Sequence, residues 1–218
     1  MRYGVFGGTF DPIHMGHLRT AEEIVQQLNL AKLFLIPAAA PPHKHCSPVS
    51  AFGHRFEMAK IAIGDSNKLE VLDIEAKREG PSYSVDTLRE LRSSLGPKND
   101  LYFIVGLEGF FEIHTWKEYR SLFDLAHFVV VERMGYRYQD IFPYLKKVGI
   151  DFRPTNDPHK VILASGSSLV HMAPTRMDIS STQIRSLVRQ GLSIRYLVPD
   201  QVMNYILAKR LYRKDEGN

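Results

Sequence analysis

Cysteine, strong net charge and long apolar segments are all scarce in this sequence of 218 residues. The single cysteine, Cys46, excludes an internal disulfide and is typical of a reducing compartment, so we expect a cytoplasmic location. No apolar run approaches the ~18 residues that span a bilayer, and the chain begins with a strand pattern instead of a signal peptide. The net charge of +4 suits an anionic ligand but is too small to predict nucleic-acid binding.

Several common functional signatures are also absent. There is no Gly-x-x-x-x-Gly-Lys-Ser/Thr loop and no Gly-x-Gly-x-x-Gly, so neither a P-loop NTPase nor a dehydrogenase is favoured. No Ser-His-Asp or Cys-His arrangement indicates covalent catalysis. Repeats, low-complexity tracts and flexible linkers are missing as well. We therefore expect one domain over residues 1–218, whose C-terminal helical part begins at about residue 180.

The segment Gly7–His17 reads Gly-Gly-Thr-Phe-Asp-Pro-Ile-His-Met-Gly-His and lies between a strand pattern and a helix pattern. Its two leading glycines let the backbone approach a ligand without a Cβ in the way. The unpaired N–H groups at the start of the helix favour an anion there. His14 and His17 are three residues apart, so they project to one side of a helix. Together these features predict a polyphosphate site.

A metal site is the alternative for the same segment. His14, His17 and Asp11 are residue types that bind zinc. However, the His-Glu-x-x-His helix pattern is absent and no fourth ligand is evident nearby. We therefore predict no protein-bound metal at these residues.

Apolar residues alternate between strand and helix patterns along the chain. Strands are predicted at 3–6, 33–36, 69–72, 101–105, 127–131 and 161–163. Helices are predicted at 18–28, 52–63, 85–95, 108–122, 184–188 and, at the C-terminus, within 197–212. A strand–helix–strand unit of this kind joins parallel strands through a right-handed crossover. We predict an α/β fold, a Rossmann-like doubly wound parallel sheet with a short C-terminal helical segment.

A second segment with functional residues, Asp178–Arg185, reads Asp-Ile-Ser-Ser-Thr-Gln-Ile-Arg at the start of a predicted helix. Ser180 and Ser181 could simply cap that helix. Their hydroxyls and the free N–H groups there could equally bind an anion. Arg185, in the next turn, is able to bind phosphate bidentately.

These two segments together resemble the signature motifs of the nucleotidyltransferase superfamily, and this version is similar to the nicotinate-nucleotide adenylyltransferases. The resemblance implies transfer of the adenylyl group of ATP to nicotinate mononucleotide, which yields nicotinate adenine dinucleotide and pyrophosphate in NAD biosynthesis. It implies Mg²⁺ bound with ATP, and it leaves the oligomeric state open. The attacking phosphate oxygen is already anionic, so catalysis requires positioning and charge neutralisation and no general base.

The resemblance also assigns site residues. It assigns catalysis to His14, His17, Lys44 and Arg185. It assigns ATP binding to Gly7, Gly8, Thr9, Phe10, His17, Gly106, Ser180, Ser181, Thr182 and Arg185. It assigns mononucleotide binding to Asp11, Lys44, Tyr83, Thr87, Trp116 and Lys117, with the pyridine ring stacked on Trp116.

Some of these residues also have a purely structural interpretation. Lys44 lies in a proline-rich loop, where a lysine is usually solvated. Ser82 or Ser84 is a candidate N-cap for the helix that follows. A single tryptophan such as Trp116 more often fills a core than binds a ligand. Glu108 stands where the family usually has aspartate, which leaves the role of this carboxylate open.

Other functions remain as alternatives. Another superfamily member could join ATP or CTP to a different phosphate acceptor, such as nicotinamide mononucleotide. A regulatory module that binds a nucleotide without turnover is a second alternative, although the motif histidines, the lysine and the arginine are all present. A nucleic-acid binder is third, and the sequence has no dense stripe of basic residues in its favour.

Overall fold

The computed structural model describes residues 1–41, 49–132 and 137–213. Its centre is one eight-stranded sheet in the order β3-β2-β1-β4-β5-β8-β7-β6. The five neighbouring pairs from β3 to β8 are parallel, whereas β7 pairs antiparallel with β8 and with β6. The strands are β1 (Arg2–Gly8), β2 (Lys32–Pro37), β3 (Leu69–Val71), β4 (Asp100–Gly106), β5 (His127–Val131), β6 (Phe152–Pro154), β7 (Lys160–Leu163) and β8 (Ser168–Met172).

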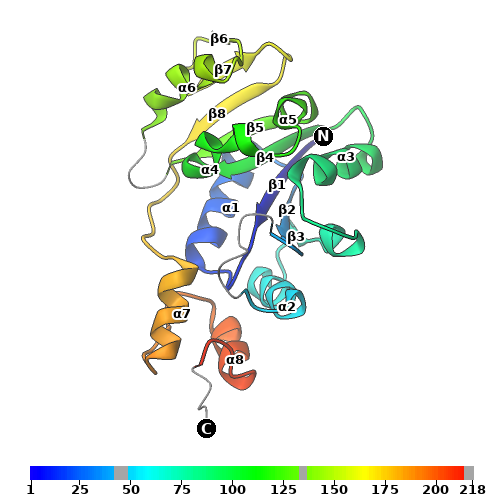
Figure 1. The fold of residues 1–218 in the computed structure, drawn as a ribbon. Coiled ribbons are helices and arrows are strands. Elements are labelled where there is room, and N and C mark those ends of the chain that lie inside the picture. Colours follow the sequence, from blue (N-terminus) through cyan, green and yellow to red (C-terminus); the bar gives the residue numbers. More distant parts are fainter. Residues whose placement is uncertain (42–48, 133–136, 214–218) are drawn as a thin grey trace.

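Helices cover both faces of this sheet. The α-helices are α1 (Met15–Gln27), α2 (Phe52–Ile63), α3 (Ser84–Leu95), α4 (Leu107–Phe111), α5 (Tyr119–Leu125), α6 (Ile141–Lys147), α7 (Ser181–Arg189) and α8 (Asp200–Ala208). Three 3₁₀ turns are η1 (Ile74–Lys77), η2 (Ile113–Thr115) and η3 (Tyr138–Asp140). Helices α7 and α8 lie together beyond the carboxyl end of β1, at the opposite end of the molecule from α6 and the β6–β7 hairpin (Figure 1).

Two hydrophobic cores lie on opposite faces of the sheet, because successive strand side chains point to opposite sides. In β4, Leu101, Phe103 and Val105 enter the core that contains α3 to α6. Tyr102 and Ile104 enter the core that contains α1, α2, α7 and α8. The predicted doubly wound arrangement is therefore confirmed.

The direction of winding changes between β1 and β4. Helix α1, which follows β1, contributes to one core, whereas α4 and α5, which follow β4, contribute to the other. The connections that leave the carboxyl ends of the paired strands β1 and β4 therefore run to opposite faces of the sheet, and a crevice lies between them. Ligands of open α/β sheets bind at such a point, and both sequence motifs lead to it.

The helix predicted over 108–122 is broken in the structure. Apolar residues recur across it at about every third position, but α4 ends at Phe111 and η2 follows as a separate turn. Trp116 is extended, and Glu118 has a φ of +47°, in the left-handed region that a continuous helix does not contain. Between α4 and α5 the hydroxyl of Thr115 donates a hydrogen bond to the carbonyl oxygen of Glu112. Such a bond from side chain to backbone competes with the backbone hydrogen bonds of a helix.

Two other local expectations need correction. Neither Ser82 nor Ser84 caps α3: Tyr83 occupies the N-cap position, and no side chain caps this helix. The hydroxyl of Ser82 instead accepts a hydrogen bond from the backbone N–H of Ala40 at 3.0 Å. In addition, β8 and β6 lie in stretches where no strand is predicted, so the sheet extends further than the sequence pattern indicates.

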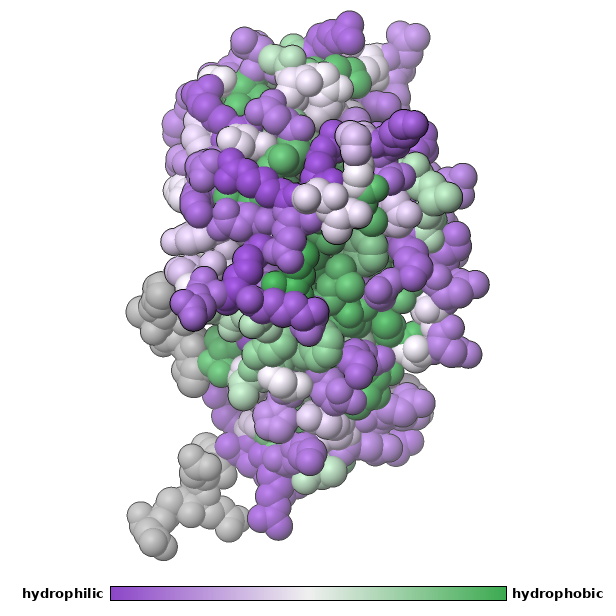
Figure 2. Space-filling model, turned by 90° about the vertical axis from the view of Figure 1, so that its right-hand side faces the viewer, coloured by the Kyte–Doolittle hydropathy of each residue, from purple (hydrophilic) through white to green (hydrophobic). Residues whose placement is uncertain are grey.

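None of the helices in the described ranges combines the length and apolarity that a membrane span requires. The side of the molecule that faces right in Figure 1 is mostly hydrophilic, with an apolar area near its middle (Figure 2).

Candidate active site

The turn that follows β1 is held by buried side chains. Phe10 has a φ of +49° and is 2% exposed. Its ring packs edge-on against those of Phe6 and His17, at centroid distances of 5.8 and 5.1 Å. A Cβ on Gly7, at the end of the strand, would meet no atom within 4 Å. The backbone at Gly7 is therefore open to a ligand, as the motif predicts.

Arg55 of α2 joins this turn to two other segments. Its side chain is 1% exposed and donates hydrogen bonds to the carbonyl oxygens of Thr9 and Ser50, both at 2.8 Å, and of Ala39 at 3.4 Å. Burial lowers the pKa of Arg55, and the nearby charge of Asp11 opposes that shift. The buried cation fixes the turn relative to the loop after β2, and the sequence pattern does not reveal this role.

His14 and His17 stand together at the start of α1. His14 is the N-cap residue and is 4% exposed, and the two rings stack with centroids 3.7 Å apart. The backbone N–H of His14 donates to Nδ1 of His17 at 3.3 Å, so the neutral His17 ring carries its proton on Nε2. A Cβ on Gly16 would lie 3.1 Å from Nδ1 of His14, which explains the glycine between the two histidines. The predicted shared orientation of the pair is confirmed.

The second motif forms the start of α7 as predicted. Ser180 is the N-cap, and its hydroxyl accepts a hydrogen bond from the backbone N–H of Gln183 at 3.1 Å. Ile184 and Val188 are buried on the inner side of the helix. Gly191 follows the last turn with a φ of +69°, as expected for a residue that ends a helix.

Helix α7 is bonded directly to the turn after β1. The hydroxyl of Ser181 donates to the carbonyl oxygen of Pro12 at 2.9 Å. Nη1 of Arg185 donates to the carbonyl oxygen of Asp11 at 2.7 Å, and Nη2 donates to the hydroxyl of Thr182 at 3.2 Å. The two motifs, far apart in the sequence, thus form one structural unit.

Two cavities meet at this unit. The larger has a volume of about 880 Å³ and lies between α1, the end of β5 and the segment that precedes α7. The smaller has a volume of about 530 Å³ and lies between the turn after β1, α3 and the Trp116 segment. Both cavities are lined by Phe6, His14, His17, Gly106, Glu108, Ile179 and Ser180. The histidine pair therefore lies at their junction.

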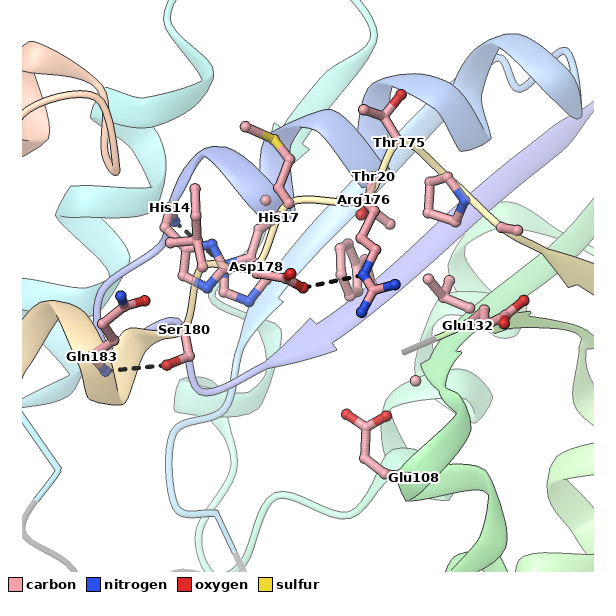
Figure 3. Close-up of a pocket in the computed structure, with 18 residues that line it drawn as sticks. His14, His17, Thr20, Glu108, Glu132, Thr175, Arg176, Asp178, Ser180 and Gln183 are labelled. Carbon is pink, nitrogen blue, oxygen red and sulfur yellow. Dashed lines mark hydrogen bonds and ion pairs between the residues drawn. The ribbon is translucent and has the colours of Figure 1, made fainter. Parts of the chain in front are cut away.

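The larger cavity has polar groups on two opposing walls. His14 and His17 stand on one side, and Glu108 and Glu132 extend from the other (Figure 3). Arg176 and Asp178 form an ion pair along the segment that leads to α7, with Nε and Oδ1 3.3 Å apart. A ligand here would contact both acidic and basic side chains.

Glu23 of α1 holds the segment that leads to α7 in place. The carboxylate, 7% exposed, accepts the backbone N–H of Thr175 at 2.9 and 3.1 Å and the Nε–H of Arg19 at 2.5 Å. The hydrogen bonds from Thr175 are the main reason that the pKa of Glu23 is lowered. The wall of the larger cavity is thus anchored to the first helix.

The smaller cavity has an aromatic wall. Trp116 is half-buried, and its ring packs edge-on against Phe103 with centroids 6.3 Å apart. Nζ of Lys117 lies 4.9 Å from the centroid of the Tyr83 ring and 3.0 Å from Oδ2 of Asp86. The charge of Lys117 is therefore already paired within the protein.

Most of the predicted site residues line these cavities. The smaller cavity is lined by Gly7, Gly8, Thr9, Phe10, Tyr83, Trp116, Lys117, Ser181, Thr182 and Arg185. His14, His17, Gly106 and Ser180 line both cavities. Lys44 lies outside the described residues.

Asp11 and Thr87 line neither cavity. Asp11 is 2% exposed, and its two carboxylate oxygens accept hydrogen bonds from Tyr212 and from the backbone of Ser50. Thr87 is 3% exposed, and its hydroxyl lies 2.7 Å from Oε1 of Glu75, to which it donates. In this structure both residues support the cavity walls from behind.

The predicted site omits one wall of the larger cavity. That wall includes Thr20, Glu132, the residues 173–178 and Gln183. Residues 173–178 directly follow β8, which the sequence pattern does not predict. Recognition of β8 would have placed them at the carboxyl edge of the sheet, where ligands bind.

Comparison with known proteins agrees with this architecture. The cytidylyltransferase-like family model matches residues 5–187. A probable nicotinate-nucleotide adenylyltransferase of Geotalea daltonii is 43% identical, with 97% of this chain and 98% of the relative covered. One from Geotalea uraniireducens is 41% identical with the same coverage. The fold matches that of the Plasmodium falciparum nicotinic acid mononucleotide adenylyltransferase in complex with NaAD, with a TM-score of 0.75, 20% identity and 97% of each chain covered. The chain therefore belongs to the nicotinate-nucleotide adenylyltransferase family of cytidylyltransferase-like enzymes.

Proposed function

We propose that this enzyme transfers the adenylyl group of ATP to nicotinate mononucleotide at the junction of its two cavities. The observation that carries the proposal is that the two cavities share the stacked pair His14 and His17. Two nucleotides, one in each cavity, would bring their phosphates together there. Holding both reactants in one orientation is itself a large part of catalysis.

In the proposed reaction a phosphate oxygen of the mononucleotide attacks the α-phosphorus of ATP. The bond from that phosphorus to the bridging oxygen breaks, and pyrophosphate leaves. Since no proton has to be removed, the protein acts by orientation and by neutralising negative charge on the leaving group. We assign this role to His17 and Arg185, which line the smaller cavity, and to the N-termini of α1 and α7.

The two cavities suit different ends of the product. The wall of Tyr83 and Trp116 gives the smaller cavity flat rings for a pyridine base. We therefore assign the mononucleotide to the smaller cavity and the adenosine part of ATP to the larger one. Lys44 stays a proposed phosphate ligand on the sequence motif alone, whereas Asp11 and Thr87 would act indirectly.

Mg²⁺ is part of the proposal as a partner of the triphosphate. Magnesium is commonly bound through substrate phosphates, waters and one or two carboxylates, and not by a dedicated protein cage. The described residues contain no cluster of three or more side chains suited to hold a metal ion. Glu108 and Glu132 are the carboxylates on the walls of the larger cavity that could contact such an ion. Mg²⁺ would supply further neutralisation of phosphate charge.

Pyrophosphate release tests the proposed function directly. Purified protein is incubated with ATP and Mg²⁺, together with nicotinate mononucleotide, nicotinamide mononucleotide or other phosphate acceptors, and CTP replaces ATP in one arm. We expect the highest kcat/KM for ATP with nicotinate mononucleotide, and full activity of metal-free protein once Mg²⁺ is added. Better use of another acceptor would change the proposed substrate. Tightly bound zinc that is required for turnover would contradict the prediction that the protein itself binds no metal at His14, His17 and Asp11. A cytoplasmic location, which the single cysteine favours, is part of the same proposal.

Replacement of Trp116 by alanine should affect one substrate selectively. Loss of a stacked ring should raise the KM for the mononucleotide about 5- to 100-fold and leave the KM for ATP nearly unchanged. Trp116→Phe keeps a ring and should give a smaller effect. If the contact with Phe103 is the main role of Trp116, both variants would instead lower the Tm and affect both substrates alike.

A further inference from the structure

The C-terminal segment returns to the turn after β1. Beyond α8 the chain reverses through Arg210 and Tyr212, which have φ values of +51° and +62°. Such angles are unfavourable for residues other than glycine, so contacts elsewhere must compensate for them. The hydroxyl of Tyr212 lies 2.7 Å from Oδ1 of Asp11, to which it donates. Residues 201 positions apart in the sequence are thus joined by one hydrogen bond.

Asp11 has a buried carboxylate with both oxygens in use. Its second oxygen, Oδ2, accepts the backbone N–H of Ser50 at 3.2 Å. The Tyr212 hydroxyl stays protonated, because burial and the neighbouring Asp11 charge raise its pKa. Removal of this donor would leave a buried carboxylate oxygen without its partner, which is costlier than loss of an exposed hydrogen bond.

The main chain of Asp11 in turn holds a proposed phosphate ligand. Its carbonyl oxygen accepts Nη1 of Arg185 at 2.7 Å. The same residue therefore bonds the C-terminal segment through its side chain and Arg185 through its backbone. A shift of Asp11 would move the acceptor that orients the guanidinium.

We propose that Tyr212 is a positioning residue for Arg185, acting through Asp11, so that the C-terminal segment sets how well the enzyme uses ATP. The inference rests on the proposed function, because Arg185 is taken as a ligand of the triphosphate. Tyr212 itself lines neither cavity.

Tyr212→Phe removes the hydroxyl and keeps the ring that packs against the core. We expect kcat/KM for ATP to fall on the order of tenfold, with the KM for the mononucleotide within about twofold of the original. Tyr205→Phe is the matched control, since it removes another tyrosine hydroxyl of the C-terminal part, one that bonds His54 and not the turn. That variant should keep normal kinetics even if its Tm falls equally.

A double-mutant cycle distinguishes positioning from general stability. Once Arg185→Ala has removed the guanidinium, Tyr212→Phe should cause no further loss of kcat/KM for ATP. The proposal would be overturned if the double variant lost activity by the product of the two single losses. Equal kinetics of the Tyr212→Phe and Tyr205→Phe proteins would also overturn it. Absence of pyrophosphate release by the unaltered enzyme would instead contradict the proposed function.

Hydrogen–deuterium exchange of the unaltered protein gives a second test, which holds even if Tyr212→Phe fails to fold. A nonhydrolysable ATP analogue should slow exchange in a peptide that covers residues 209–213. Because binding and segment order are linked, each should stabilise the other. Unchanged exchange at saturating analogue would contradict the proposal.

Discussion

Replacement of His17 by alanine is expected to lower kcat on the order of 100-fold or more, which is typical of losing one donor that stabilises developing charge. His17 lines both cavities, and its Nδ1 is already bonded to the backbone of His14. We assign its other ring nitrogen, Nε2, as the donor to a phosphate oxygen. The expected loss is in turnover, because charge on the leaving pyrophosphate develops during the reaction.

Two further variants separate the structural and the chemical role of this ring. Asparagine at position 17 places an acceptor near Nδ1 and can keep the bond from His14, whereas glutamine places a donor near Nε2. We expect His17→Asn to be folded and as slow as His17→Ala, and His17→Gln to recover part of the activity. The histidine control is His54→Ala, since His54 bonds Tyr205 and lines neither cavity. Near-normal kcat for His17→Ala, with circular dichroism unchanged, would refute the assignment.

Arg185→Ala should be comparably severe, with kcat/KM for ATP reduced on the order of 100-fold. The guanidinium lines the smaller cavity and is held in place by Asp11 and Thr182. Lysine lacks the planar fork that binds phosphate bidentately, so Arg185→Lys should recover only part of this loss.

A second arginine on the same helix provides the control. Arg189 lies one turn further along α7 and is exposed, so Arg189→Ala removes the same charge from the protein without altering either cavity. Its kinetics should stay close to those of the unaltered enzyme. Similar losses in the Arg189→Ala and Arg185→Ala proteins would show that the overall charge matters and not the position.

The sequence was most informative where function depends on local geometry. The glycines and histidines of residues 7–17 act within one strand-to-helix turn, and Ser180 caps a helix that its own neighbours define. Spacing within such short segments predicts which side chains lie on the same side of a helix or turn. The central parallel strands were also predictable, because each is a short and continuous apolar run.

The remaining features depend on contacts between distant segments. Arg55 holds three backbone carbonyls, one from the turn after β1 and two from the connection between β2 and α2, and Glu23 holds the backbone of Thr175. Neither interaction leaves a periodic signal in the sequence. The break before α5 gives no signal in the sequence pattern for a related reason. The apolar spacing continues across it, while the left-handed backbone at Glu118 depends on tertiary structure.

The outer part of the sheet, which consists of β6, β7 and β8, has a practical consequence for work on this enzyme. Among the described residues, the lining of the larger cavity passes from Glu132 to Ala173 and that of the smaller cavity from Leu122 to Ile179, so α6, β6, β7 and β8 contribute no lining side chain. The turn between β7 and β8 is exposed at Ala164, Ser165 and Gly166, at the end of the molecule opposite α7 (Figure 1). A fluorophore or an affinity tag inserted there would lie far from both nucleotides and would still report on the intact sheet.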